Sequence, residues 1–153
     1  RMTGARLFAM PKLRPVRIAP GLFGHGVPDE ELVVSPEHRI AVKGAAAREL
    51  FNTSEVLVAA KDLINGLTVT VDLKMREVTY VHLLFDHHQV IWANSVETES
   101  FHPASASLKT LDEEDRMRLL QQHPELEDDP HLYGNFARRN LSTSEAAILS
   151  HVA

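Results

Sequence analysis

Two groups of polar side chains in this sequence have types and spacings that could carry chemistry. The first is Ser35-Pro36-Glu37-His38, in which a hydroxyl precedes an imidazole by three residues between two apolar segments. An imidazole can protonate a leaving amine or polarise a carbonyl, and a hydroxyl can hold a reacting group. The same residues are typical of a plain turn, because Ser-Pro commonly starts one. Spacing alone favours the turn.

The second group lies in the stretch from Val78 to Ser100, the longest run of strand-forming residues in the chain. Strand alternation would place His82, Asp86 and His88 on one face. Two histidines and one carboxylate are also the composition of a divalent-metal facial triad. A metal-dependent enzyme that uses these three residues is therefore one hypothesis.

A turn is the favoured interpretation of the centre of this stretch. Asp86-His87-His88 would then be a polar hairpin turn between strands over residues 78–85 and 89–93. Under this interpretation His82 is the inward-facing functional residue. Trp92-Ala93-Asn94-Ser95 predicts a strand end and a second tight turn. The residues that follow, Glu97, Glu99 and Ser100, predict a solvated strand face.

Several shorter elements must position these residues. Residues 1–30 are rich in Pro and Gly and predict mostly loop, with a helical turn near residues 6–10. The patterns predict strands over residues 16–18, 31–35, 38–43, 55–58 and 67–71, a helix over 45–51, a helical turn over 59–64 and a turn at Asn65-Gly66.

The character of the chain changes after Ser100. Thr110-Leu111-Asp112-Glu113 has the T-x-x-E pattern of a capping box and predicts a helix to about Gln122, stopped by Pro124. Ser142-Thr143-Ser144-Glu145 repeats the pattern before a final helix. We therefore expect a β-rich body over residues 1–102 and a helical extension over residues 103–153, packed on the body because neither helix is long enough to be stable alone.

Composition excludes several classes of function. The formal charge of −5 over 153 residues, with no basic cluster, argues against a nucleic-acid groove. No apolar run is long enough to cross a bilayer. The absence of cysteine excludes disulfides, thiolate zinc sites and a cysteine nucleophile within this sequence.

Residues 34–42, V-S-P-E-H-R-I-A-V, resemble the T-x-x-H block of Hint (hedgehog/intein) domains. Ser35 stands in the place of the threonine, and His38 is the block histidine. Residues 13–18, L-R-P-V-R-I, and the helical extension resemble the bacterial subgroup of these domains.

Residues 80–95, Y-V-H-L-L-F-D-H-H-Q-V-I-W-A-N-S, resemble the C-terminal block of the same domains. His88 matches its internal histidine, and Ala93-Asn94-Ser95 matches its A-N-G turn. The resemblance covers about residues 13–150, and the order and separation of the blocks support it better than any single motif. It implies a mainly β fold, incomplete at the N-terminus, with a C-terminal helical tail.

The resemblance also implies an activity. Hint domains cleave their own backbone: a Cys or Ser at the first residue of the domain attacks the preceding carbonyl in an N-to-S or N-to-O acyl shift. His38 would protonate the departing nitrogen, and Ser35 would hold the strained peptide or the oxyanion. His82 and His88 would support these two catalytic residues. The substrate would be the adjacent polypeptide in cis, and no cofactor or metal is expected.

The sequence departs from the family pattern in three places. It has no cysteine and Arg1 cannot attack, so we expect the nucleophile to be missing and this chain to be inactive by itself. Glu99-Ser100 occupies the place of the terminal His-Asn pair of inteins, which argues against splicing. The aspartate that opens the C-terminal block of inteins falls at about His82.

Two alternatives stay open beside self-cleavage. One is the metal-dependent enzyme described above, and the other is a non-catalytic Hint-like module that binds or displays adjacent domains. An incomplete β fold would leave unpaired strand edges. We expect these edges to be covered by the helical tail or paired in a homodimer.

Overall fold

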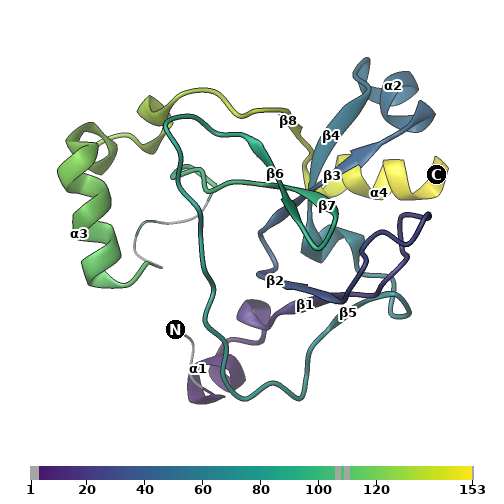
Figure 1. Ribbon diagram of the computed structural model, residues 1–153, viewed down its shortest axis with the longest axis horizontal. Coiled ribbons are helices and arrows are strands. Elements are labelled where there is room, and N and C mark those ends of the chain that lie inside the picture. Colours follow the sequence, from purple (N-terminus) through teal and green to yellow (C-terminus); the bar gives the residue numbers. More distant parts are fainter. Residues whose placement is uncertain (1–3, 106–107, 109–110, 153) are drawn as a thin grey trace.

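The computed structural model describes residues 4–105, 108 and 111–152, and within them the fold is mainly β with a C-terminal helical tail (Figure 1). A three-stranded antiparallel sheet has the order β2-β1-β5. Its strands are β1 (Val16–Ile18), β2 (Leu32–Val34) and β5 (Val69–Val71). These three strands agree with the sequence-based expectation.

A second sheet has five strands in the order β6-β7-β3-β4-β8. Its strands are β3 (Arg39–Lys43), β4 (Glu55–Ala59), β6 (Val90–Ala93), β7 (Val96–Glu99) and β8 (Arg139–Asn140). All neighbours are antiparallel except β4 and β8, which are parallel. The turn between β6 and β7 has Asn94 and Ser95 at positive φ, 47° and 64°, as a two-residue hairpin requires.

Short helices connect and cover the sheets. The α-helices are α1 (Gly4–Ala9), α2 (Ala45–Phe51), α3 (Glu113–Gln122) and α4 (Thr143–Val152), and the 3-10 turns are η1 (Pro11–Leu13), η2 (Ala60–Leu63), η4 (Pro124–Glu127) and η5 (Pro130–Tyr133). The predicted capping box of the last helix is confirmed. Ser142 Oγ accepts from the Glu145 backbone N–H at 3.3 Å, and the Glu145 carboxylate accepts from the Ser142 N–H at 2.8 Å.

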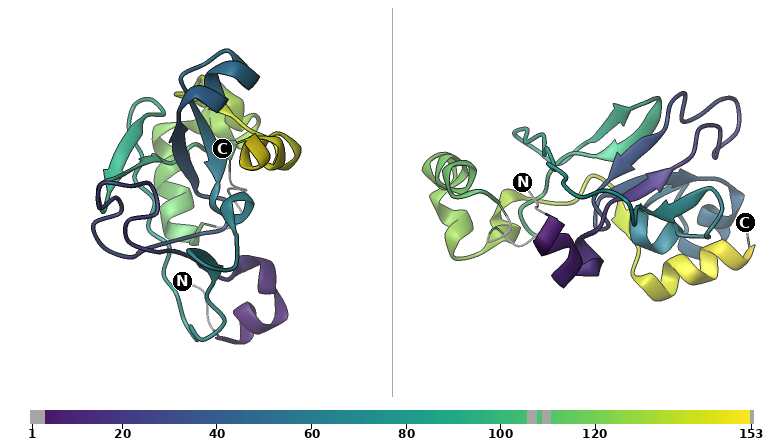
Figure 2. Two further views of the ribbon diagram at one scale, coloured as in Figure 1. Left: turned by 90° about the vertical axis from the view of Figure 1, so that its right-hand side faces the viewer. Right: turned by 90° about the horizontal axis from the view of Figure 1, so that it is seen from below.

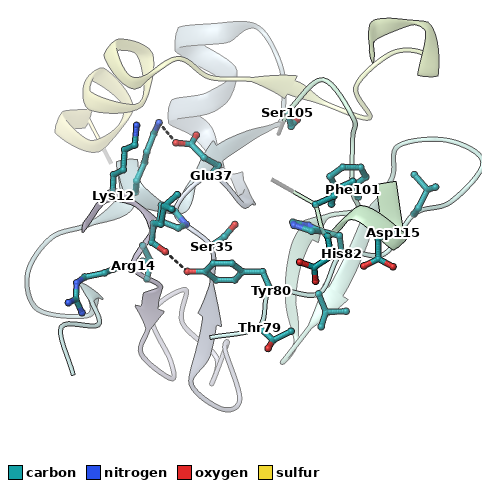
Figure 3. Close-up of a pocket in the computed structure, with 18 of the residues that line it drawn as sticks. Lys12, Arg14, Ser35, Glu37, Thr79, Tyr80, His82, Phe101, Ser105 and Asp115 are labelled. Carbon is teal, nitrogen blue, oxygen red and sulfur yellow. Dashed lines mark hydrogen bonds and ion pairs between the residues drawn. The ribbon is translucent and has the colours of Figure 1, made fainter. Parts of the chain in front are cut away.

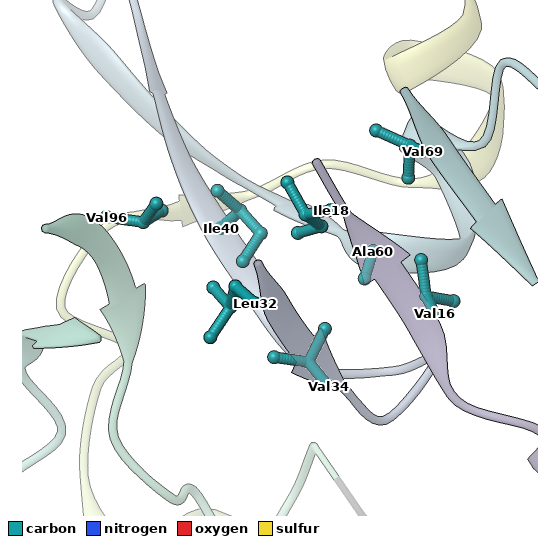
Figure 4. Close-up of a cluster of buried hydrophobic side chains, with 8 residues drawn as sticks. All are labelled: Val16, Ile18, Leu32, Val34, Ile40, Ala60, Val69 and Val96. Atoms are coloured by element: carbon teal, nitrogen blue, oxygen red, sulfur yellow. The ribbon is translucent and has the colours of Figure 1, made fainter. Parts of the chain in front are cut away.

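The main core lies between the two sheets (Figure 4). It consists of buried aliphatic side chains from both sheets and from η2: Val16, Ile18, Leu32, Val34, Ile40, Ala60, Val69 and Val96. Each fully buried Val, Leu or Ile contributes about 1.5–3 kcal/mol relative to an exposed one. This core fixes the corner at which the chain passes from β2 to β3.

The tail packs on the body in two places. Leu141, Ala146 and Leu149 bury against Val56 and Val58 of β4. Far from this contact, α3 lies at the opposite end of the molecule from α4 (Figure 2). A third cluster lies beneath α3 and contains Phe101, Leu119, Leu126 and Tyr133. The division of the chain at residue 102 stays a prediction, although residues beyond it supply a strand of the larger sheet.

The predicted strand over residues 78–85 is wrong. Only Val78 makes an isolated bridge, and residues 79–89 belong to no strand. The expected hairpin turn at Asp86-His87-His88 is therefore absent, although the chain bends at Asp86 and His87. Strand-forming side chains are not sufficient without a neighbouring ladder. The predicted start of the following helix at Thr110 lies outside the described residues, and the described helix begins at Glu113 after the N-cap residue Asp112.

The described residues form no helix that is long and apolar enough to cross a membrane. The expected homodimer stays a prediction.

Candidate active site

The turn from Ser35 to His38 joins the two sheets. The His38 backbone N–H donates to the Ser35 carbonyl at 3.0 Å, which confirms the predicted turn. The turn is also held from outside, because Ala60 N–H donates to the His38 carbonyl at 2.8 Å and Lys61 N–H donates to the Pro36 carbonyl at 2.9 Å. The backbone that carries Ser35 and His38 is therefore fixed at both ends.

A cavity of about 990 Å³ opens beside this turn (Figure 3). Ser35 lines it, and His82 lines it from the extended segment over residues 79–84. Tyr80 crosses the cavity, and its hydroxyl donates to the Leu13 carbonyl at 2.7 Å. Burial raises the pKa of Tyr80 to about 12, so the phenol stays protonated at neutral pH. Side chains of α3 complete the wall.

His38 and His82 are electrostatic neighbours. Burial lowers the pKa of His38, the charge of Glu99 opposes this shift, and His82 adds to it. His82 is exposed at the cavity mouth, with its ring 5.0 Å from that of Phe101, yet lost hydration lowers its pKa as well and Glu99 again opposes the shift. Both imidazoles therefore favour the neutral form. The protonated minority of each ring is a stronger acid than free histidine.

Glu99 is the residue that the sequence-based prediction missed. The predicted solvated face is wrong for Glu99 and Ser100, which are 5% and 1% exposed. Glu99 Oε1 accepts from the Arg39 backbone N–H at 3.0 Å, and Oε2 lies 3.3 Å from His88 Nε2 without hydrogen-bond geometry. The acidic residues of β7 suggested solvent, but His88 lies against Glu99, and residues of the tail contact His88. Nothing in the local pattern indicates these contacts.

His88 lies behind Glu99 and away from the cavity lining. Its side chain is fully buried. Its Nδ1 accepts from the Ala137 backbone N–H at 2.9 Å, which leaves the proton of a neutral ring on Nε2, facing Glu99. Both ring nitrogens are thus occupied by structural contacts. This geometry supports a holding role for His88 better than proton transfer.

His102 is a second buried histidine that the sequence did not single out. Its Nε2 donates to the Gly134 carbonyl at 3.0 Å, and its Nδ1 accepts from Ala104 N–H at 3.1 Å. Its ring stacks on Phe136 with a centroid distance of 4.0 Å and meets the edge of the His88 ring at 5.2 Å. Burial lowers the pKa of His102, partly offset by the hydrogen bond to Gly134.

The residues proposed for a metal site do not converge. Asp86 and His87 are exposed, and His88 is buried under the tail. In the described ranges no three His, Asp or Glu side chains are arranged to hold a metal ion. The expectation that His82, Asp86 and His88 share a strand face fails because the segment is not a strand.

Ser35 and His82 thus line the cavity, and His38 lies on the same turn as Ser35, within electrostatic range of His82, whereas His88 lies against Glu99. No curated protein and no solved structure matches the chain. A family model described as the Hint domain matches residues 1–105, which include both sequence blocks and the cavity-lining residues Ser35 and His82. The match ends before α3, so it supports the family resemblance for the body. This chain belongs to the Hint domain family.

Proposed function

We propose that this chain is part of a self-cleaving Hint domain, which breaks one backbone peptide bond in cis. The observation that carries the proposal is that Ser35 and His82 line one cavity, and that His38, on the same turn as Ser35, lies within electrostatic range of His82 in a Hint-family chain. The rigid turn supports it further. A proton donor that is already held in position lowers the barrier to breaking the peptide bond, because no further ordering is needed during the reaction.

The proposed step is an acyl shift. A Ser hydroxyl or Cys thiol at the head of the domain attacks the carbonyl carbon of the preceding residue. A carbon–oxygen or carbon–sulfur bond forms, the carbon–nitrogen bond breaks, and the nitrogen leaves as an amine. This sequence has no cysteine, so a thiol nucleophile would come from residues outside it. The resulting ester is then opened by water or by another nucleophile.

His38 supplies the proton in this proposal. A departing amide nitrogen is a poor leaving group until it is protonated, and a lowered imidazole pKa makes the donor a stronger acid. Ser35 lies three residues away on the same turn, where its hydroxyl can donate to the developing oxyanion. His82 can accept the proton of the attacking hydroxyl, because its neutral form predominates.

Self-cleavage of the full-length protein tests the proposal. We expect His38→Ala to slow cleavage by roughly 100-fold or more, since removing a general acid commonly has an effect of this size. His87→Ala is the matched control, because His87 is an exposed histidine of the second motif. The measurement is the time course of the cleaved fragments on a gel. Equal rates in wild type and His38→Ala would exclude His38 as the donor, and an intact wild type would exclude self-cleavage.

A further inference from the structure

The carboxylate of Glu99 is almost inaccessible to water. It is 5% exposed, and an ionised carboxylate in such a position is unfavourable unless other groups compensate it. The compensation is incomplete. Oε1 accepts one backbone N–H, from Arg39, whereas Oε2 makes no hydrogen bond to any residue that the structure describes. Packing in the protein interior therefore does not by itself explain why a charged residue stands at position 99.

The backbone group bound by Glu99 belongs to the residue after His38. The hydrogen bond from Arg39 N–H to Glu99 Oε1 spans 3.0 Å and lies where the Ser35–His38 turn enters β3. It therefore fixes the C-terminal side of the turn, as the bond from Ala60 N–H to the His38 carbonyl does. Glu99 thus helps to determine where the His38 backbone lies.

The charge of Glu99 acts on histidines from several elements. His38 belongs to the turn, His82 and His88 to the segment before β6, and His102 follows β7. His88 and His102 have both ring nitrogens in contact with other groups. Within the part of the chain that the structure describes, the rings of His38 and His82 make no hydrogen bond. The negative charge of Glu99 therefore acts on two rings that are free to exchange protons.

We propose that Glu99 is a positioning residue for His38: it anchors the adjacent backbone and stabilises the imidazolium that protonates the leaving nitrogen. This inference rests on the proposed self-cleavage for its purpose, although its physical content concerns His38 alone. Burial of His38 disfavours the charged ring, and the negative charge of Glu99 offsets part of that penalty. Without Glu99, fewer molecules would carry the proton at neutral pH.

The titration of His38, followed by NMR on the 153-residue chain, tests the inference without requiring cleavage. Glu99→Gln keeps the size of the side chain and offers an amide oxygen to the Arg39 N–H, but it removes the charge. We expect the midpoint of His38 to fall by roughly 0.5–1 pH unit, because loss of a nearby opposite charge lowers a histidine pKa. The ring signals are assigned with His38→Gln.

Glu97→Gln is the matched control, since Glu97 lies on the same strand and face but pairs with Lys43. It should leave the His38 midpoint in place. An unchanged midpoint in folded Glu99→Gln would overturn the inference. If Glu99→Gln does not fold, Glu99→Asp replaces it. The shorter acid withdraws the charge by one methylene, so we expect a smaller fall, and a folded Asp variant with no shift overturns the inference equally.

The pH profile of cleavage in the full-length protein provides the functional readout. The high-pH limb reports loss of the His38 proton, so in Glu99→Gln it should move to lower pH by the same amount as the NMR midpoint. A uniform loss of rate with no shift of this limb would indicate a purely structural role and overturn the inference. Absence of cleavage in the wild type would refute the proposed function but not the NMR result.

Discussion

The molecule holds two contrasting pairs of histidines around Glu99. In the open pair, His82 lines the cavity and His38 belongs to the turn beside it, and within the described residues neither ring makes a hydrogen bond. The closed pair, His88 and His102, is buried beneath the tail, with each ring held by backbone groups and by Phe136. All four rings share one residue type and one neighbouring carboxylate.

Burial and hydrogen bonding, rather than membership of a sequence motif, therefore distinguish the histidines that can exchange protons from those that hold the structure together. His82 and His88 lie six residues apart in one motif, yet they belong to different pairs. Both ring nitrogens of His102 and the Nδ1 of His88 are hydrogen-bonded, and these atoms cannot exchange a proton without breaking the bonds. The open pair keeps this freedom because none of the described residues hydrogen-bonds to its rings, whereas residues of the tail hydrogen-bond to both rings of the closed pair.

The largest expected effect is a loss of stability in the closed pair. His102→Ala removes two hydrogen bonds and the Phe136 stack from a residue that is 1% exposed. We expect it to lower the free energy of unfolding by about 3 kcal/mol, against less than about 1 kcal/mol for His38→Ala. Urea denaturation followed by circular dichroism measures both. Similar losses at the two positions would contradict the division into pairs.

The second effect is a dependence of stability on pH. Burial lowers the pKa of His102, His38 and His82, so the unfolded chain binds more protons between their folded pKa values and about 6.5. Stability should therefore fall as pH drops below about 6.5, by at most about 1.4 kcal/mol per pH unit for His102 and for His38, and by less for His82, whose exposed ring is screened by solvent. Denaturant titrations over this range measure the slope. His102→Gln should make the slope of unfolding free energy against pH shallower. An unaltered slope would show that His102 does not contribute to it.

The third effect is spectroscopic. Nδ1 of both closed-pair rings accepts a backbone N–H, so their neutral forms should be locked with the proton on Nε2. The open pair has no such lock and should exchange between its two tautomers. Ring ¹⁵N chemical shifts at a pH above the histidine titrations distinguish the two cases. The same ¹⁵N shift pattern in all four rings would contradict the distinction between the open and the closed pair.

The smallest effect concerns the two glutamates of β7. The partner of Glu97 is Lys43, whose side chain is 51% exposed. Surface pairs of this kind contribute little, so we expect Glu97→Gln to cost less than about 0.5 kcal/mol. Glu99→Gln should change the unfolding free energy more, in either direction, because its charge is buried. Thermal melts of both variants give the comparison, and a larger change at Glu97 would reverse it.

Local patterns were sufficient for much of the fold. Val16–Ile18 and Ala45–Phe51 match the predicted strand and helix, and the Ser142 cap was readable from four residues. The strand is readable from its β-branched side chains, although it pairs with distant strands, and the helix and the cap depend on neighbours within one or two turns. The turn at Ser35–His38 was predicted for the same reason.

Long-range pairing was the part that the sequence did not reveal. Residues 79–89 have strand-forming side chains, but a strand also needs an adjacent ladder, which local pattern does not encode. Their backbone is instead bound by side chains and by single hydrogen bonds, as where Phe101 N–H donates to the Leu83 carbonyl at 2.8 Å. The contacts of His88 likewise depend on residues more than 40 positions later in the chain, Phe136 and Ala137.

The short strand β8 has a consequence for where this protein can be divided. Residues 134–137 precede it and supply the partners of both closed-pair rings, while β8 itself pairs with β4 in the middle of the body. The region matched by the family ends at residue 105, before all of these contacts. We therefore expect the cooperative folding unit to be longer than the family region, so that a chain cut at that boundary would leave both closed-pair rings without these partners.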